Sequence, residues 1–321
     1  MAVRRSVLVD TDIGVDDALA LLTVLNEPDA DVIGIGTVFG NCTEVQAASN
    51  ALVVLAAADR LDVPVCIGQS RPGRQPKAPS PHGSDGLGDR GLVPPSGATP
   101  SAETAVDQIL RVGRERPSEV DLLCLGPLAN VAAALEQDPL ILTRYRAVTI
   151  MGGMGPVGRR DTESAAQPLF LAKGDTNTNH APAASAAVAA APGPVTWVGM
   201  NVTGKLRMPW ADLTALAGQS TTAAFVRDIT TDYHRYCTTT YRSAEPIYTS
   251  HDSVAAAAML DPTVVLSAAD LTGRILRASD GRASLWGQSV TQSDRHRFAF
   301  DLDYTAIRRR INAVLGARVA R

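Results

Sequence analysis

The order of apolar segments most constrains the fold of this chain, because short apolar runs alternate with longer amphipathic stretches over its first two-thirds. The runs expected to form strands span residues 6–10, 31–39, 63–68, 119–126, 147–152 and 194–200. The stretches expected to form helices span residues 15–26, 44–60, 127–137, 181–191, 221–241 and 252–260. Parallel strands need long crossover connections, so this alternation predicts an α/β fold with a mostly parallel, Rossmann-like sheet flanked by helices.

The C-terminal part of the chain has a different pattern. Short runs at 271–277, 283–290 and 297–301 predict a small antiparallel appendage, closed by an arginine-rich final helix. Residues 69–100 are rich in Gly, Pro and Ser and lie inside the alternation, which favours an active-site flap over a linker. We see no composition break, so we expect a single domain spanning residues 1–321.

Composition excludes several classes of protein. Hydrophobic residues make up 45% of the chain and charged residues 20%, which suits a large buried core and excludes a disordered protein. A formal net charge of −3 argues against a nucleic-acid partner. No apolar run is long enough to span a membrane, and the four scattered cysteines resemble free thiols. We therefore expect a cytoplasmic enzyme with a small-molecule substrate.

The strongest chemical signal is an acidic turn after the first expected strand, the segment DTDIGVDDA at residues 10–18. Asp10 and Asp12 share one side of the strand end, Gly14 permits a tight turn, and Asp16 and Asp17 open the next helix. Four neighbouring carboxylates repel one another unless a cation neutralises them. A hard divalent cation such as Ca²⁺ fits oxygen ligands in irregular geometry. The alternative is that Asp16 only caps the helix and Asp12 only forms the turn.

Several motifs in matching order give the chain a resemblance to the nucleoside hydrolase family, the calcium-dependent, inosine- or uridine-preferring enzymes that cleave nucleosides. The acidic turn resembles the family's DxDxxxDD signature. Further matches follow at VFGN (38–41), HGSDGLG (82–88), LGPLAN (125–130), MGG (151–153) and SHD (250–252). The resemblance covers about residues 6–260 and, more loosely, the tail. It implies the fold and the hydrolase activity of that family, and a homodimer or homotetramer.

The resemblance also implies roles for particular residues. Side chains of Asp12, Asp17 and Asp252 would bind calcium, together with the backbone carbonyl of Ala129, where the family usually has Thr. Asp16 and Asn41 would bind ribose hydroxyls. Asp10 would support the turn.

One segment departs from the family. Residues 171–182 carry Asp175 where the family has Glu, and Asn177 at the matching Asn. The family's Asn just upstream falls near Leu169, so that polar contact is expected to be lost. Ribose recognition by Asp175 and Asn177 is therefore expected to be altered.

Other signals are weaker. The GxGxxG spacing at 153–158 contains a proline and is followed by charged residues rather than a helix, so a dinucleotide site is not expected. His82 in the flap reads as an exposed loop residue. His251 directly precedes a predicted ligand and is our candidate for both base binding and proton donation. Tyr241 is the candidate for stacking on the nucleobase.

The sequence thus predicts hydrolysis of the N-glycosidic bond of ribonucleosides, with Asp12 as general base and Ca²⁺ as cofactor. Two alternatives stay open. The DTD segment also suggests a magnesium-dependent DxD phosphatase or phosphotransferase, although Gly14 occupies the position where that motif needs Thr. The altered Asp175 segment also suits a non-catalytic nucleoside- or ribose-binding homologue.

Overall fold

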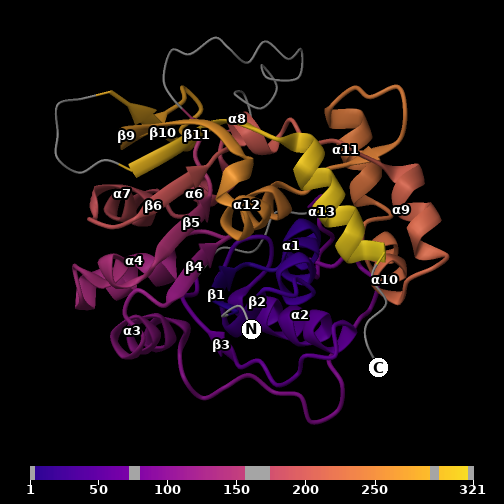
Figure 1. The fold of residues 1–321 in the computed structure, drawn as a ribbon, viewed down its shortest axis with the longest axis horizontal. Coiled ribbons are helices and arrows are strands. Elements are labelled where there is room, and N and C mark those ends of the chain that lie inside the picture. Colours follow the sequence, from indigo (N-terminus) through magenta and orange to yellow (C-terminus); the bar gives the residue numbers. More distant parts are fainter. Residues whose placement is uncertain (1–3, 72–79, 156–173, 290–295, 317–321) are drawn as a thin grey trace.

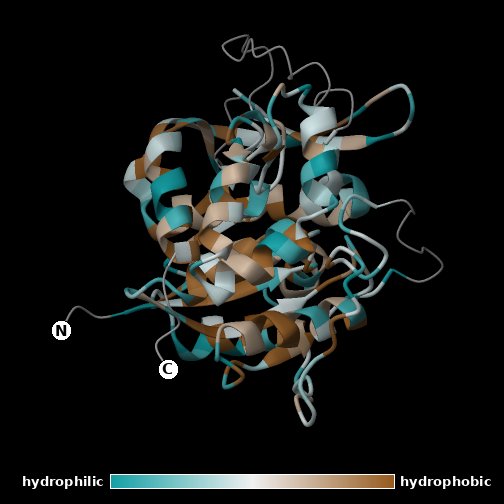
Figure 2. Ribbon diagram, turned by 90° about the vertical axis from the view of Figure 1, so that its right-hand side faces the viewer, coloured by the Kyte–Doolittle hydropathy of each residue, from teal (hydrophilic) through white to brown (hydrophobic). Residues whose placement is uncertain are grey.

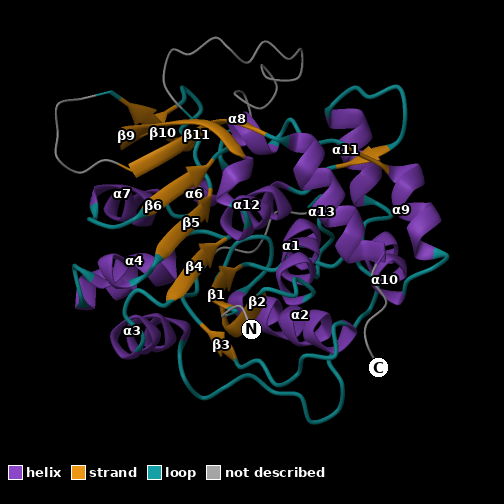
Figure 3. Cartoon of the chain, viewed as in Figure 1, coloured by secondary structure: helices purple, strands orange, loops and turns teal. Residues whose placement is uncertain are grey.

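The computed structural model describes residues 4–71, 80–155, 174–289 and 296–316. Among these residues, nine strands form one sheet in the order β10-β9-β11-β6-β5-β4-β1-β2-β3 (Figures 1 and 3). Their bounds are β1 Arg5–Thr11, β2 Ala30–Thr37, β3 Val65–Ile67, β4 Val120–Cys124, β5 Ala147–Met151, β6 Val195–Val198, β9 Val265–Arg277, β10 Ala283–Gln288 and β11 His296–Leu302.

The sheet is parallel from β3 through β11 and becomes antiparallel only at β9 and β10. β1 lies between β2 and β4, so its backbone is paired on both edges. Its central residues Val7, Leu8 and Val9 are all buried, as expected for a parallel strand covered on both faces. This confirms the predicted mostly parallel α/β fold.

Helices cover both faces of the sheet (Figure 1). One face carries α3 (Ala105–Glu115), α4 (Ala129–Gln137) and α7 (Pro182–Ala190). The other carries α1 (Val15–Leu25), α2 (Glu44–Ala57), α12 (His251–Leu260) and α13 (Tyr304–Gly316). The remaining helices are α6 Thr176–His180, α8 Met200–Thr203, α9 Trp210–Ala217, α10 Thr221–Ile229 and α11 Tyr233–Thr240, and a short ribbon joins β7 (Met208–Pro209) to β8 (Ile247–Tyr248).

The core is built from small aliphatic side chains, and Figure 2 shows apolar residues concentrated on the sheet and on the helix faces that touch it. Helix α12 packs on α1 through a run of buried alanines from Ala255 to Ala258. Small side chains let the two helices approach closely. The N-termini of both helices lie at the same end of the sheet, where Asp16 of α1 contacts Ser250 and His251. That shared end is where the acidic residues lie.

Several elements differ from the sequence-based expectation. The expected helix at 221–241 is two helices, α10 and α11, and the hydroxyl of Thr230 caps the end of α10 by bonding back to Val226 O. Helices α3, α6, α8 and α9 were not anticipated. The C-terminal strands are antiparallel as expected, but β11 also pairs in parallel with β6, so they extend the central sheet. No helix among the described residues could cross a membrane.

Candidate active site

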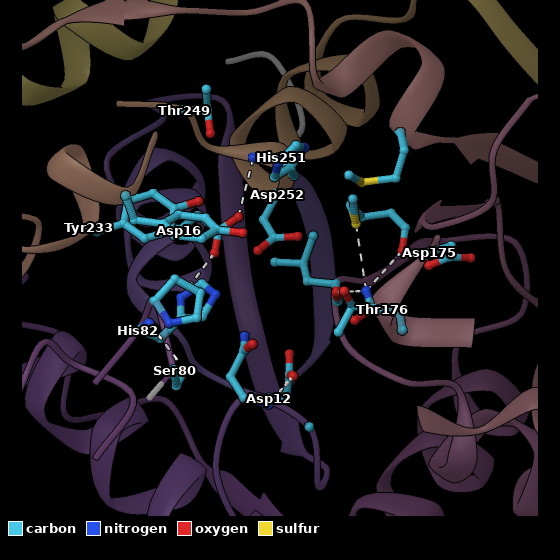
Figure 4. Close-up of a pocket in the computed structure, with 18 of the residues that line it drawn as sticks. Asp12, Asp16, Ser80, His82, Asp175, Thr176, Tyr233, Thr249, His251 and Asp252 are labelled. Atoms are coloured by element: carbon cyan, nitrogen blue, oxygen red, sulfur yellow. Dashed lines mark hydrogen bonds and ion pairs between the residues drawn. The ribbon is translucent and has the colours of Figure 1, made fainter. Parts of the chain in front are cut away.

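A cavity of about 350 Å³ opens at the carboxyl ends of the central strands. Asp12, Leu125 and Met151, which follow or end β1, β4 and β5, line its floor. Loops and helix N-termini converge at this edge of an α/β sheet, which is where such folds bind ligands. Figure 4 shows Asp16 and Asp252 in the middle, His82 and Tyr233 on one side, and Asp175 and Thr176 on the other.

The turn between β1 and α1 is fixed by Asp17. Its side chain accepts hydrogen bonds from the Gly14 amide at 2.8 Å, from Asn41 Nδ2 at 3.0 Å and from the Thr11 hydroxyl. The Gly14 contact is the reciprocal half of a capping box, since Asp17 is the third residue of α1. The capping role considered for this turn is therefore real, but it belongs to Asp17 and not to Asp16.

Asp12 is held in a narrow slot on the cavity floor. Its Oδ2 accepts the backbone amide of Asn41 at 2.6 Å. A Cβ atom placed on Gly40 would lie 1.9 Å from Asp12 Oδ2, and one placed on Gly126 would lie 2.9 Å from Asp12 Oδ1. Both glycines are therefore needed for the carboxylate to occupy this position.

Asp16 and Asp252 meet across the junction of α1 and α12. Asp16 Oδ2 accepts the backbone amide of His251 at 3.2 Å, and its backbone carbonyl accepts the Ser250 hydroxyl at 3.1 Å. Ser250 also caps α12, so Asp252 lies in the first turn of that helix. These contacts join two segments that are more than 230 residues apart in the sequence.

Carboxylate oxygens from Asp16, Asp17 and Asp252 all lie within 4.8 Å of one another. Burial raises the pKa of each of these side chains, and repulsion from neighbouring carboxylates raises the pKa of Asp17 and Asp252 further. The pKa of Asp12 is raised by burial and by the nearby Asp17. Within the described ranges, no lysine or arginine forms an ion pair with any of these four carboxylates.

This donor set fits a hard cation. Buried carboxylates without a lysine or arginine partner favour either protonation or a bound cation. Carboxylate oxygens are the ligands that Ca²⁺ and Mg²⁺ prefer. The sequence grouped Asp12, Asp17 and Asp252, whereas the tightest group in the structure contains Asp16 in place of Asp12. Asp12 remains on the same cavity floor and electrostatically coupled to the others.

Two histidines stand beside the carboxylates. His251 lines the cavity, and its Nδ1 lies 2.8 Å from the Thr203 hydroxyl. His82 Nδ1 accepts the Val15 amide at 3.2 Å and lies 3.6 Å from Asp16 Oδ1. Burial lowers the pKa of His82 to about 4, and burial also lowers the pKa of His251. His82 is therefore not the exposed loop residue that the sequence suggested, since its side chain is 13% exposed and part of the cavity wall.

The aromatic wall comes from α11. Tyr233 and Tyr241 are buried and line the cavity, with Cys237 between them on the same helical face. The Tyr233 ring lies 5.2 Å from the His82 ring. Sequence reasoning named Tyr241 but missed Cys237, although the spacing of four residues from Tyr233 to Cys237 to Tyr241 places all three on one face.

The opposite wall holds Asp175 and Asn177, and here the structure differs from the expected ribose site. Asp175 caps α6, accepting hydrogen bonds from the Gly153 amide at 2.7 Å, from the Thr178 amide at 3.2 Å and from the Thr178 hydroxyl. Asn177 Nδ2 donates to Leu125 O at 2.6 Å and to Met151 O at 3.2 Å. Both residues line the cavity, and their hydrogen bonds attach this wall to the ends of β4 and β5.

Other predicted residues are placed as follows. Asn41 lines the cavity, with its side-chain amide directed to Asp17. Ala129 is the first residue of α4, and Leu125 lines the cavity just after the end of β4. Leu169 lies outside the described residues. His180 and Thr176 also line the cavity and were not anticipated.

Asp10 has the supporting role expected for it. Its Oδ1 accepts Asn130 Nδ2 at 2.7 Å, and Asn130 in turn bonds to Thr37 O and to the Gln69 amide. This network ties the ends of β1, β2 and β3 to the start of α4. Burial raises the pKa of Asp10 to about 7.

Comparisons with known proteins agree with this site. Residues 7–309 match the family described as inosine-uridine preferring nucleoside hydrolases. The chain is 30% identical over 263 residues to a probable uridine nucleosidase 2 of Oryza sativa subsp. japonica, covering 81% of this chain and 75% of that protein. It is 31% identical over 235 residues to the pyrimidine-specific ribonucleoside hydrolase RihA of Salmonella typhimurium, covering 71% and 72% of the two chains.

A solved structure extends the likeness to nearly the whole chain. The plant nucleoside hydrolase PpNRh1 superimposes with a TM-score of 0.82 at 25% identity, covering 98% of this chain and 99% of that one. The chain therefore belongs to the inosine-uridine preferring nucleoside hydrolase family and is an N-ribosyl hydrolase of nucleosides.

Proposed function

We propose that this chain hydrolyses ribonucleosides to ribose and free nucleobase in a calcium-dependent reaction. The observation that carries the proposal is the buried cluster of Asp16, Asp17 and Asp252, because two of its members, Asp16 and Asp252, line a cavity that is walled by histidines and tyrosines. A bound cation would neutralise this cluster, and the tyrosine rings of the adjoining wall are suited to stack on a nucleobase. The cavity volume of about 350 Å³ is suited to a small molecule.

Asp12, Asp17 and Asp252 are the side chains proposed to hold calcium. We assign Asp16 to the sugar hydroxyls, because its contacts with the His251 amide and with His82 direct it toward the middle of the cavity. The backbone carbonyl of Ala129, at the start of α4, is proposed as the main-chain ligand. When bound, a calcium ion lowers the pKa of a water molecule and so supplies a nucleophile near neutral pH.

Asp12 is proposed as the general base. Its slot between Gly40 and Gly126 and its bond to the Asn41 amide hold the carboxylate in one orientation. Burial and the neighbouring Asp17 raise its pKa, and a bound cation would oppose this shift. Asp12 would take a proton from the attacking water as positive charge develops on the sugar.

The remaining residues hold the sugar and the base. Asp16, Asn41 and Asn177 are proposed to face the ribose hydroxyls, and the carboxylate of Asp16 would favour an oxocarbenium-like transition state. Asp175, which caps the N-terminus of α6, is also proposed to lie on the sugar side of the cavity. His251 is proposed to donate a proton to the departing nucleobase, and Tyr241 to stack on it.

Release of reducing sugar from a panel of nucleosides, with phosphate absent and with or without a chelator, tests the proposal. We expect ribose release that stops on chelation and returns with CaCl₂. Nucleoside binding without sugar release would support a non-catalytic binding protein instead. Release of phosphate from phosphate esters with Mg²⁺ would support the DxD phosphatase alternative.

We also propose a cytoplasmic location and a homodimeric or homotetrameric assembly. The four cysteines are free and buried, which suits a reducing compartment. The oligomeric state is measurable by light scattering during size-exclusion chromatography, where a monomer mass would contradict this part of the proposal.

A further inference from the structure

Thr203 holds the ring of His251 from outside the cavity. Its hydroxyl lies 2.8 Å from His251 Nδ1, and the residue is fully buried. Thr203 is not among the residues that line the cavity, whereas His251 is. Of the cavity-lining residues that its hydroxyl contacts, His251 is the nearer, since the sulfur of Met200 lies 4.0 Å away. We therefore expect Thr203 to act on a bound nucleoside mainly through the histidine.

Helix α8, which carries Thr203, is fixed by contacts with several separate elements. The Met200 amide donates to Gly153 O at 2.8 Å, at the end of β5, and Asn201 Nδ2 donates to Ala299 O of β11 at 2.9 Å. The Tyr304 hydroxyl of α13 donates to Val202 O at 3.2 Å. A four-residue helix anchored in this way offers a rigid point of attachment for the imidazole.

The main chain of His251 is fixed independently. Its amide donates to Asp16 Oδ2 at 3.2 Å, and Ser250 caps the helix that His251 begins. The main-chain bond sets the position of Cα, but it leaves rotation about the side-chain torsions open. The Thr203 contact supplies the second fixed point, so the ring has one preferred orientation with Nδ1 toward Thr203 and Nε2 toward the opposite edge.

We propose that Thr203 is a positioning residue that aims Nε2 of His251 at the departing nucleobase. This inference rests on the proposed role of His251 as proton donor. A hydroxyl both donates and accepts, so Thr203 can bond to Nδ1 whether or not Nδ1 carries a proton. In the transfer, the Nε2–H bond of the imidazolium breaks and an N–H bond forms on the base. The neutral ring that remains keeps its Nδ1–H bonded to the Thr203 oxygen.

Valine and serine substitutions separate the hydroxyl from the shape of the side chain. Thr203→Val keeps the volume and removes the hydrogen bond, and Thr203→Ser keeps the hydroxyl. We expect Thr203→Val to lower kcat on the preferred nucleoside by about 10-fold or more, the scale of a misoriented catalytic group. Its effect on p-nitrophenyl riboside should be small, because that leaving group departs without a proton. Thr203→Ser should restore most of the nucleoside activity.

A matched control measures the general effect of exchanging a buried threonine hydroxyl for a methyl group. Thr23 is fully buried in α1, and its hydroxyl bonds only to Leu19 O of its own helix at 2.8 Å among the contacts found. Thr23→Val should leave the ratio of nucleoside to aryl riboside activity unchanged. If Thr203→Val is too unstable to assay, Thr203→Ala removes the same hydroxyl without placing a methyl group against the ring.

The double variant with His251→Ala completes the test. If Thr203 acts through His251, adding Thr203→Val to His251→Ala should slow nucleoside hydrolysis no further. Equal slowing of both substrates by Thr203→Val, failure of Thr203→Ser to rescue, or a full additional loss in the double variant would each overturn the proposal. A wild-type protein that cleaves neither substrate would instead refute the proposed function itself.

Discussion

Two buried aspartates in the same cavity, Asp252 and Asp175, have opposite surroundings. Asp175 is surrounded by hydrogen-bond donors, namely the amides of Gly153 and Thr178 and the Thr178 hydroxyl, and it caps the N-terminus of α6. Asp252 is surrounded by carboxylates, and repulsion from Asp16, Asp17 and Asp12 adds to burial in raising its pKa. A buried carboxylate that accepts hydrogen bonds from the chain is stabilised without a ligand. Neighbouring buried carboxylates repel one another and are stabilised by protonation or by a bound cation.

The two sides of the cavity therefore differ in their proposed roles. The side built by β1, α1 and α12 carries the clustered carboxylates, whose charge a cation would neutralise. The side built by α6 is fastened to the ends of β4 and β5 through Asn177 and Asp175. Four predictions can break or sharpen this distinction.

The largest effect is expected at the carboxylate cluster. Asp17→Ala and Asp252→Ala should each abolish turnover, since each removes a ligand that the remaining carboxylates cannot replace. Asp252→Asn is the gentler change, because it keeps the size of the side chain. Ribose release measured with excess CaCl₂ checks this expectation, and undiminished calcium content in either alanine variant would contradict the ligand assignment.

A smaller effect is expected when the base is neutralised. Asp12→Asn keeps an oxygen that can accept the Asn41 amide and bind a cation, but it cannot accept a proton from water. We expect calcium binding to survive and kcat to fall by about 10²-fold or more. Single-turnover kinetics with saturating nucleoside measure this step, and a near-normal kcat would remove Asp12 from the role of base.

The sugar contacts should give the next effect. Loss of a hydrogen bond to a charged group costs about 1.5–3 kcal/mol, so a 2′-deoxynucleoside should lose about 10-fold or more in kcat and not only in affinity. Comparing kcat and KM for matched ribo- and deoxyribonucleosides checks this. Equal kcat values would show that the 2′-hydroxyl is not held in the transition state.

The smallest effect on chemistry is expected at Asp175. Asp175→Asn keeps an oxygen that can cap α6, but it replaces Oδ2, the acceptor of the Gly153 amide, by an NH₂ group. We expect a lower melting temperature, with a cost of about 1–3 kcal/mol for the unpaired buried amide, while kcat changes only a few-fold. Asp175→Glu should impair activity by crowding, because the extra methylene has to fit between Gly153 and Thr178. A higher kcat/KM in Asp175→Glu would indicate that the site is built for glutamate after all.

Much of this arrangement could be predicted from the sequence. The strand segments and the mostly parallel α/β class follow from local patterns, and the acidic turn after β1 is visible as four aspartates within eight residues. The capping box of Asp17, in contrast, depends on backbone geometry around Gly14 that the motif does not specify. The motif also could not show that Asp16 and not Asp12 lies nearest to Asp17 and Asp252, because that depends on how α12 packs on α1.

The features that sequence reasoning did not find also have physical causes. His82 was read as exposed because a loop histidine usually is, whereas its ring packs on Tyr233 and bonds to the Val15 amide. Thr203 had no sequence signal, since its partner lies 48 residues away.

Calorimetric titration of the chelator-treated protein with CaCl₂ tests the central claim most directly. The wild type and Asp175→Asn should each bind one calcium ion with similar affinity, while Asp252→Asn should show no binding or an affinity lowered by about 10²-fold or more, the upper range for disturbed metal sites. Absence of binding in the wild type, or equal loss in Asp175→Asn and Asp252→Asn, would contradict the account.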